Sequence, residues 1–225
     1  VKLAIMDAID HRTAITNLDP ALRSSLIERK DGPGLLRFGF HLGAIIALGT
    51  LIALRAPFWF LLLPVQGILI VFLFTALHEC IHETAFKSSF LNTAISSISG
   101  FLILIPPVWF RFFHFAHHRH THDPARDPEL LTPKPSTVIG YVKHVSGLPL
   151  WFSAIRTLLR NATGRGAEDY VPEKAKARVS AEARVMLALY ALLAVASVFW
   201  QSPLMIWTWI VPALLGQPFL RLFLL

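Results

Sequence analysis

Histidine is concentrated in two short segments of this chain. Seven of its ten histidines lie in the words HECIH, at residues 78–82, and HFAHHRHTH, at residues 114–122. Residues three or four positions apart share one face of a helix, and neutral imidazole is a common ligand of iron, zinc and copper. The spacing therefore predicts that His78 and His82 point one way, and that His114, His117 and His118 form a second convergent set, each able to bind a metal.

Both histidine segments are expected at the same depth of a membrane. HECIH directly follows an apolar run that ends at Leu77, so its imidazoles emerge about one helical turn beyond that run. HFAHH follows an aromatic stretch, residues 109–113, and aromatic side chains favour the membrane–water boundary. The two segments can therefore face one shared site.

Several neighbouring residues could support the imidazoles instead of binding metal. Glu79, Glu83, Asp123 and Asp127 could each accept a hydrogen bond from the second nitrogen of a ligand histidine. They could equally form helix ends and turns, especially where Asp precedes Pro. His120 does not share the helix face of His114 and His118, so we interpret it as a residue that supports the ligands. Cys80 is interpreted as a small buried residue that fills space in the core.

HECIH is also an H-E-x-x-H motif, which is typical of zinc metalloproteases with Glu79 as the general base. A catalytic zinc takes three protein ligands and a water. The second cluster supplies more histidines than one such zinc needs and favours a binuclear site, although an intramembrane protease stays an alternative. A zinc-binding transporter is a further alternative, but only His41 and Gln66 would place polar groups near the middle of a span.

The composition points to a membrane protein. Hydrophobic residues make up 54% of the 225 residues and charged residues 16%, against about 25% charged residues in soluble domains. The single cysteine excludes an internal disulfide and any multi-cysteine zinc or iron–sulfur site. Residues 1–34 contain no apolar segment typical of a secretory signal.

The apolar runs predict an all-α, polytopic membrane protein with four transmembrane helices in two hairpins. Runs of roughly 20 apolar residues are long enough to cross the hydrocarbon core. Polar residues and two consecutive prolines in the run 90–108 favour a re-entrant or interfacial element there. The predicted spans cover residues 38–54, 58–77, 185–200 and 203–220.

The chain is interpreted as a single domain, 1–225, whose basic residues predict its orientation. Of the 21 Lys and Arg residues, six precede Phe38 and thirteen lie between Leu77 and Val185. Cytosolic loops are enriched in Lys and Arg, so the N-terminus and the histidine-rich region are expected in the cytosol. The charged run 174–184 is interpreted as a solvated lead-in to the third span. The parts are a cytosolic arm, 1–37, hairpin one, 38–77, the cytosolic and interfacial histidine region, 78–184, and hairpin two, 185–225.

The two histidine boxes resemble those of the integral-membrane fatty acid desaturase and hydroxylase superfamily. H-x-x-x-H follows a transmembrane hairpin, and H-x-x-H-H lies some thirty residues further on. The words HECIHETAF, WFRFFHFAHHRHTHDPARDPEL and GQPFLRLFLL look like the bacterial fatty acid desaturase branch, over residues 77–225. The family also has a third histidine box after its fourth transmembrane helix, so we expect this chain to be truncated before that box.

The resemblance implies a function and a ligand set. In such proteins the residues that match His78, His82, His114, His117 and His118 bind two non-haem irons, which use O2 to desaturate a fatty-acyl chain of a membrane lipid. A fatty-acyl or alkane hydroxylase or a carotenoid ketolase of the same superfamily is the close alternative. Electrons would come from a ferredoxin or a cytochrome b5-like protein, and the net charge of +7 would suit an acidic donor or anionic lipid equally. We expect a multi-pass protein of the bacterial inner membrane with a cytosolic active site, and no nucleic-acid partner.

Overall fold

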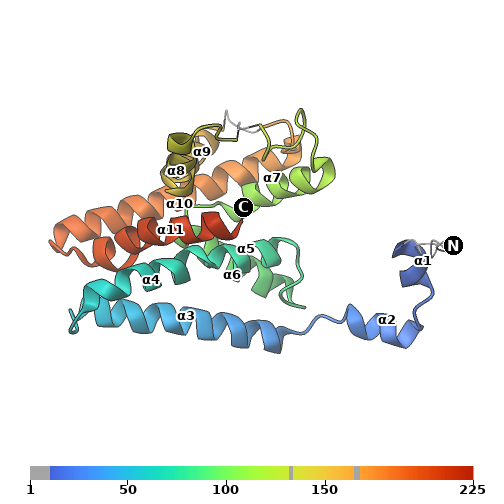
Figure 1. The fold of residues 1–225 in the computed structure, drawn as a ribbon, viewed down its shortest axis with the longest axis horizontal. Helices are drawn as coiled ribbons and strands as arrows, with labels where there is room; N and C mark the ends of the chain where they lie inside the picture. Colours follow the sequence, from blue (N-terminus) through green and yellow to red (C-terminus); the bar gives the residue numbers. More distant parts are fainter. Residues whose placement is uncertain (1–10, 132–133, 165–167, 225) are drawn as a thin grey trace, which may run out of the picture.

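The computed structural model describes residues 11–131, 134–164 and 168–224, so residues 1–10 of the predicted arm lie outside it. The described residues form helices and no strand (Figure 1). Two short helices at the N-terminal end extend away from the helix bundle, beyond the start of the long helix α3. The helices are α1 (His11–Thr16), α2 (Pro20–Leu26), α3 (Asp31–Ala53), η1 (Trp59–Leu61), α4 (Leu62–Val71), α5 (Leu73–Ile81), α6 (Ser89–Leu102), α7 (Pro107–His120), α8 (Val138–Val145), α9 (Leu148–Ala162), α10 (Glu173–Phe199), η2 (Ile206–Ile210) and α11 (Val211–Phe223).

Four helical segments among the described residues are long and apolar enough to cross a membrane, which confirms the predicted all-α, polytopic fold class. These segments also extend beyond the predicted spans. Helix α3 begins at Asp31 and α10 at Glu173, because polar residues continue each apolar helix without a break. The four segments are Pro20–Ala53, Trp59–Ile81, Glu173–Phe199 and Ile206–Phe223.

The two hairpins pack together where α4 crosses α11. A Cβ atom on Gly67 would lie 1.9 Å from the carbonyl oxygen of Pro212, and a Cβ atom on Gly216 would lie 2.2 Å from the Gly67 backbone. Only glycine allows such an approach, and small residues are the usual means of close helix packing in membranes. The crossing fixes hairpin one against hairpin two.

Polar groups inside the spans are used in contacts between helices. The Nε2 atom of His41 lies 2.7 Å from the carbonyl oxygen of Leu69, which joins α3 to α4. Gln66 is 2% exposed and donates from Nε2 to the carbonyl oxygen of Thr208 at 3.2 Å, which joins α4 to η2. These two side chains therefore connect helices, as buried polar groups in membrane bundles commonly do.

Helix α5 places the first histidine box against the core. Leu73, Leu77 and Ile81 follow one another at intervals of four residues and are between 0% and 4% exposed, so they form the buried face of α5. His78 and His82 each follow a member of this face by one residue, so they lie at its edge. The core contact of α5 therefore determines where its imidazoles point.

The second box lies on α7, beyond a sharp bend. Helices α6 and α7 meet at an angle of 96°, and such a bent pair forms either a broken span or a re-entrant loop, so the re-entrant or interfacial element stays a prediction. The hydroxyl of Tyr190 donates to the carbonyl oxygen of Phe101 at 2.7 Å, and Trp209 Nε1 donates to that of Leu102 at 2.8 Å. Side chains from α10 and η2 thus donate to backbone carbonyls in the last turn of α6, at the bend.

The start of α7 is satisfied by Glu182 of α10. Pro106 is the N-cap residue of α7 and Pro107 its first residue, and neither has an N–H, so Val108 and Trp109 carry its first free donors. The Val108 N–H donates to both carboxylate oxygens of Glu182 at 3.0 Å, and the Trp109 N–H donates to one of them at 3.3 Å. The interpretation of residues 174–184 as a solvated run is therefore wrong for Glu182, because its carboxylate has exchanged water for these two backbone donors.

Candidate metal centre

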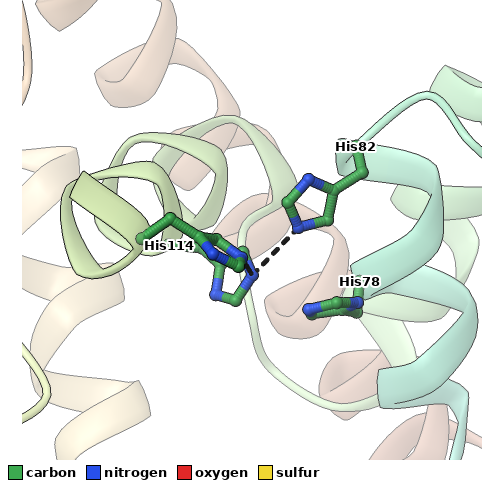
Figure 2. Close-up of side chains that lie close together, drawn as sticks. His78, His82 and His114 are labelled. Carbon is green, nitrogen blue, oxygen red and sulfur yellow. Dashed lines mark hydrogen bonds between the residues drawn. The ribbon is translucent and has the colours of Figure 1, made fainter. Parts of the chain in front are cut away.

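Four histidines from the two boxes converge. Ligand nitrogens of His78, His82, His114 and His118 all lie within 4.8 Å of one another. His78 and His82 come from the end of α5, and His114 points toward them from α7 (Figure 2). The predicted meeting of the two boxes is present in the fold, across more than 30 residues of sequence.

The spacing of the nitrogens suits a metal ion. His114 Nε2 lies 3.0 Å from His82 Nε2 and 2.8 Å from His118 Nε2. Two nitrogens at right angles around one metal, each bound at about 2.1 Å, would be about 3.0 Å apart. Neutral imidazoles with no carboxylate among them suit iron, zinc or copper better than magnesium or calcium. The donor set therefore fits a transition metal.

The environment of the cluster favours neutral imidazole, the form that binds metal. His114 is 6% exposed, and its Nδ1 atom is buried without a hydrogen-bond partner among the described residues. Burial lowers the pKa of His82 below its usual value, and the imidazoles of His78 and His118 lower it further. Protonation of His82 is disfavoured because burial penalises a positive charge and because protonated His78 or His118 nearby would repel it.

His117, the fifth residue of the predicted ligand set, lies beside this group but is not one of the four. Its ring centroid is 5.9 Å from that of His114 and 5.7 Å from that of His118. Its Nδ1 atom lies 2.9 Å from an oxygen of Asp127, a carboxylate that is 1% exposed. Burial alone would raise the pKa of Asp127, but hydrogen bonds from His117 and from the Glu129 N–H outweigh it and hold the pKa below its usual value.

The other acidic residues near the boxes differ in what they contact. Glu79 lies 3.1 Å from His78 Nδ1 through one oxygen and accepts from the Thr84 hydroxyl at 2.7 Å through the other. Asp123 instead accepts from the backbone of Ala125 and from Arg126, so it forms a turn. Glu79 and Asp127 therefore each contact an imidazole, whereas the described contacts of Asp123 are those of turn chemistry. His120 is not among the four converging histidines.

Two residues that contact the helices of the histidine boxes were not identified as functional from the sequence. Arg111 sits in the aromatic stretch before the second box, and it contacts the end of α5. Glu182 lies more than 70 residues from the backbone that it caps. A charged residue inside an apolar or aromatic stretch is itself a signal, since burying a charge is costly without a partner. The sequence does not identify that partner.

Comparison with known proteins agrees with the resemblance of the two histidine boxes. The model of a family described as fatty acid desaturase matches residues 55–224, which is most of the chain. The sn-1 oleoyl-lipid 12-desaturase of Picosynechococcus sp. is 25% identical over 122 residues, which cover 50% of this chain and 35% of that protein. The matched stretch thus spans about a third of the length of this curated relative. No solved structure matches the chain significantly.

Proposed function

The chain belongs to the fatty acid desaturase family, and from that premise we propose that it is an O2-dependent, iron-containing membrane oxidoreductase that introduces a double bond into the fatty-acyl chain of a lipid. The observation that carries the proposal is the convergence of four imidazoles from two helices at the end of a candidate membrane span. The similarity to an oleoyl-lipid desaturase supports a lipid-linked acyl substrate. Hydroxylation of such a chain begins with the same hydrogen abstraction and is the alternative outcome.

We propose that two irons are bound by His78, His82, His114, His117 and His118. When bound, the irons would activate O2, which supplies the oxidising equivalents that remove hydrogen from an unactivated methylene group. His117 is included because donation of its Nδ1–H to Asp127 would leave Nε2 as a free acceptor, oriented by a buried carboxylate. Five imidazoles do not fill the coordination of two irons, so additional ligands outside this set are part of the proposal.

Aromatic side chains separate the imidazoles from the interior of the bundle. Phe110 stacks on His114 with ring centroids 5.4 Å apart, and Phe74 lies 6.2 Å from His78. Phe74 and Phe110 are also in edge contact, at 5.6 Å. This apolar side of the cluster would exclude water and suit an acyl chain that arrives from the membrane.

The zinc alternatives fit less well. In a protease Glu79 would have to act on a metal-bound water, but its two oxygens contact His78 and Thr84. Four imidazoles also exceed the three protein ligands typical of a catalytic zinc. A transporter would need several free polar groups in its spans, whereas His41 and the Nε2 atom of Gln66 contact backbone oxygens of neighbouring helices, and the Gln66 Oε1 atom is buried without a partner among the described residues.

The orientation is a further part of the proposal. We place the histidine cluster and the N-terminus on the cytosolic side of the bacterial inner membrane, where a ferredoxin or a cytochrome b5-like donor could reach the site. In sealed vesicles, cysteines introduced at Ser202 and Pro57 should be protected from a cytosolic thiol reagent, and one at Thr163 should be labelled. The reverse labelling pattern would contradict this orientation.

Metal analysis and lipid analysis test the function. Expressed in membranes, the full-length protein should contain close to two irons per chain and should yield unsaturated acyl lipid. His82→Ala and His118→Ala should each abolish product without loss of membrane insertion, because neighbouring groups at fixed positions cannot replace a lost ligand. Purified protein with one zinc and no iron would refute the proposal.

A further inference from the structure

We propose that Arg111 is a positioning residue that fastens the first histidine box to the second. It lies on α7, one turn before His114, and its guanidinium contacts residues on either side of His82 in the first box. The inference rests on the proposed metal-binding function of the boxes, but its structural core is a contact between two helices. In this proposal Arg111 binds no metal itself, but its substitution changes the distance between the histidines that do.

The end of α5 is a complete hydrogen-bonded cap in which Arg111 takes part. Glu83 has a left-handed backbone with φ +60°, its N–H donates to the Cys80 carbonyl at 3.0 Å, and the Thr84 N–H donates to the Glu79 carbonyl at 3.1 Å. This is the pattern of a Schellman cap, with His82 as the last half-helical residue. Arg111 Nη1 donates to the Ile81 carbonyl oxygen, another of the free carbonyls at this helix end.

Arg111 makes two further contacts that lead to the first box. Its Nη1 atom lies 3.2 Å from a carboxylate oxygen of Glu83, the residue with the left-handed backbone. Its guanidinium also lies over the ring of Phe115, 4.8 Å from the ring centroid, and that ring packs against the imidazole of His82 at 5.3 Å. Arg111 thus contacts the residue before His82, the residue after it, and the ring that packs against it.

The chemistry of these contacts requires arginine. A guanidinium is planar and permanently charged, so it can donate in its own plane to Ile81 and Glu83 while its face covers Phe115. Lysine would keep the charge but would lose the planar face and the fixed direction of the donors. The positive charge also lies at the C-terminal end of α5, where the helix dipole favours it.

The geometric consequence concerns the two boxes. His82 and His114 are held on different helices, and their Nε2 atoms are 3.0 Å apart. Since His82 is the cap residue of α5, fraying of that last turn would move its imidazole away from His114. Arg111 prevents this by connecting the turn directly to α7, so the separation does not depend on the intervening chain.

Amide hydrogen exchange of the metal-free protein in lipid nanodiscs tests the contact itself. Arg111→Met should increase exchange at the amides of Glu83 and Thr84 by about tenfold or more, because a charge-assisted hydrogen bond to the cap is lost. The exchange rates of these amides in Arg111→Lys should lie between those of Arg111→Met and those of the unsubstituted protein. Arg119→Met is the matched control, an exposed arginine two turns further along α7, and should leave these amides unchanged. Unchanged exchange in Arg111→Met would overturn the inference.

Titration with Co2+ tests the consequence for metal binding. Loss of a residue that orients ligands should weaken Co2+ binding by about 10-fold to 100-fold in Arg111→Met and alter the ligand-field spectrum. Leu158→Ala, which removes a core side chain between α9 and α10, supplies a destabilised variant that should keep the spectrum of the unsubstituted protein. If the unsubstituted protein binds no Co2+, the proposed metal function fails while the exchange result still decides the role of Arg111. Co2+ binding and spectrum in Arg111→Met that match those of the unsubstituted protein would overturn the positioning role.

Discussion

Replacement of Glu182 by alanine should destabilise the start of α7 and with it the second histidine box. Its carboxylate accepts the first two free N–H groups of α7 from a different helix, at 3.0 Å and 3.3 Å. No side chain of the α7 N-terminus caps the helix itself, since its cap residue is Pro106. In Glu182→Ala both donors would lose their partner at a partly buried bend.

The expected magnitude follows from these two bonds. A hydrogen bond to a charged group contributes about 1.5–3 kcal/mol, and the Val108 N–H, bonded to both oxygens, is the stronger of the two donors. The longer Trp109 bond adds less, and water that reaches this partly buried site would recover part of the loss. We therefore expect the free energy of unfolding to fall by about 2–3 kcal/mol. Glu182→Gln, which keeps the shape and one acceptor oxygen, should lose about half of that.

Equilibrium unfolding in mixed micelles would measure these differences, and amide exchange at Val108 and Trp109 would locate them. Glu173→Ala is the matched control, since that glutamate lies on the same helix with an 87% exposed side chain that pairs with Lys176. Its effect should stay within about 0.5 kcal/mol. The capping argument is refuted if Glu182→Ala behaves like Glu173→Ala, or if the two α7 amides exchange no faster.

Two further substitutions test the support of the site and the packing beneath it. Asp127→Asn should weaken metal binding by about 10-fold or more, because the buried carboxylate that accepts from His117 is lost. Asp123→Asn, which alters a turn, should not weaken it, and equal effects of the two substitutions in a Co2+ titration would contradict this. Gly67→Ala should lower the thermal unfolding midpoint strongly, because its Cβ atom would overlap backbone of α11, whereas Gly43→Ala, with no atom within 4 Å of the added Cβ, should not. A Gly67→Ala protein as stable as Gly43→Ala would contradict the close crossing.

The features that the sequence predicted correctly depend on local periodicity. The apolar runs predict the four candidate spans, because hydrocarbon thickness determines their length. The spacing of His78 and His82, and of His114 and His118, predicts which imidazoles share a helix face. The prediction that the two boxes face one site needed one further premise, that both segments lie at the same membrane boundary.

The features that the sequence did not predict depend on contacts between distant residues. Asp123 and Asp127 are both followed by proline and lie four residues apart, yet one forms a turn with Arg126 and the other is buried against His117. Nothing in the local pattern separates these outcomes, because each depends on which carboxylate the fold encloses. Glu182 looked solvated for the same reason, since its neighbours in the charged run are cations on an exposed helix face.

The C-terminus of α5 and the N-terminus of α7 share one physical arrangement. Arg111 satisfies a carbonyl at the C-terminus of α5, and Glu182 satisfies N–H groups at the N-terminus of α7. Each charge has the sign that the helix dipole favours at that end, and each comes from a helix other than the one it caps. A cap supplied by the same helix would stabilise that helix alone, whereas a cap supplied by a neighbour also fixes the position of one helix relative to another. The order of contacts from α10 to α7 and from α7 to α5 therefore links the spacing of the imidazoles to the third candidate span.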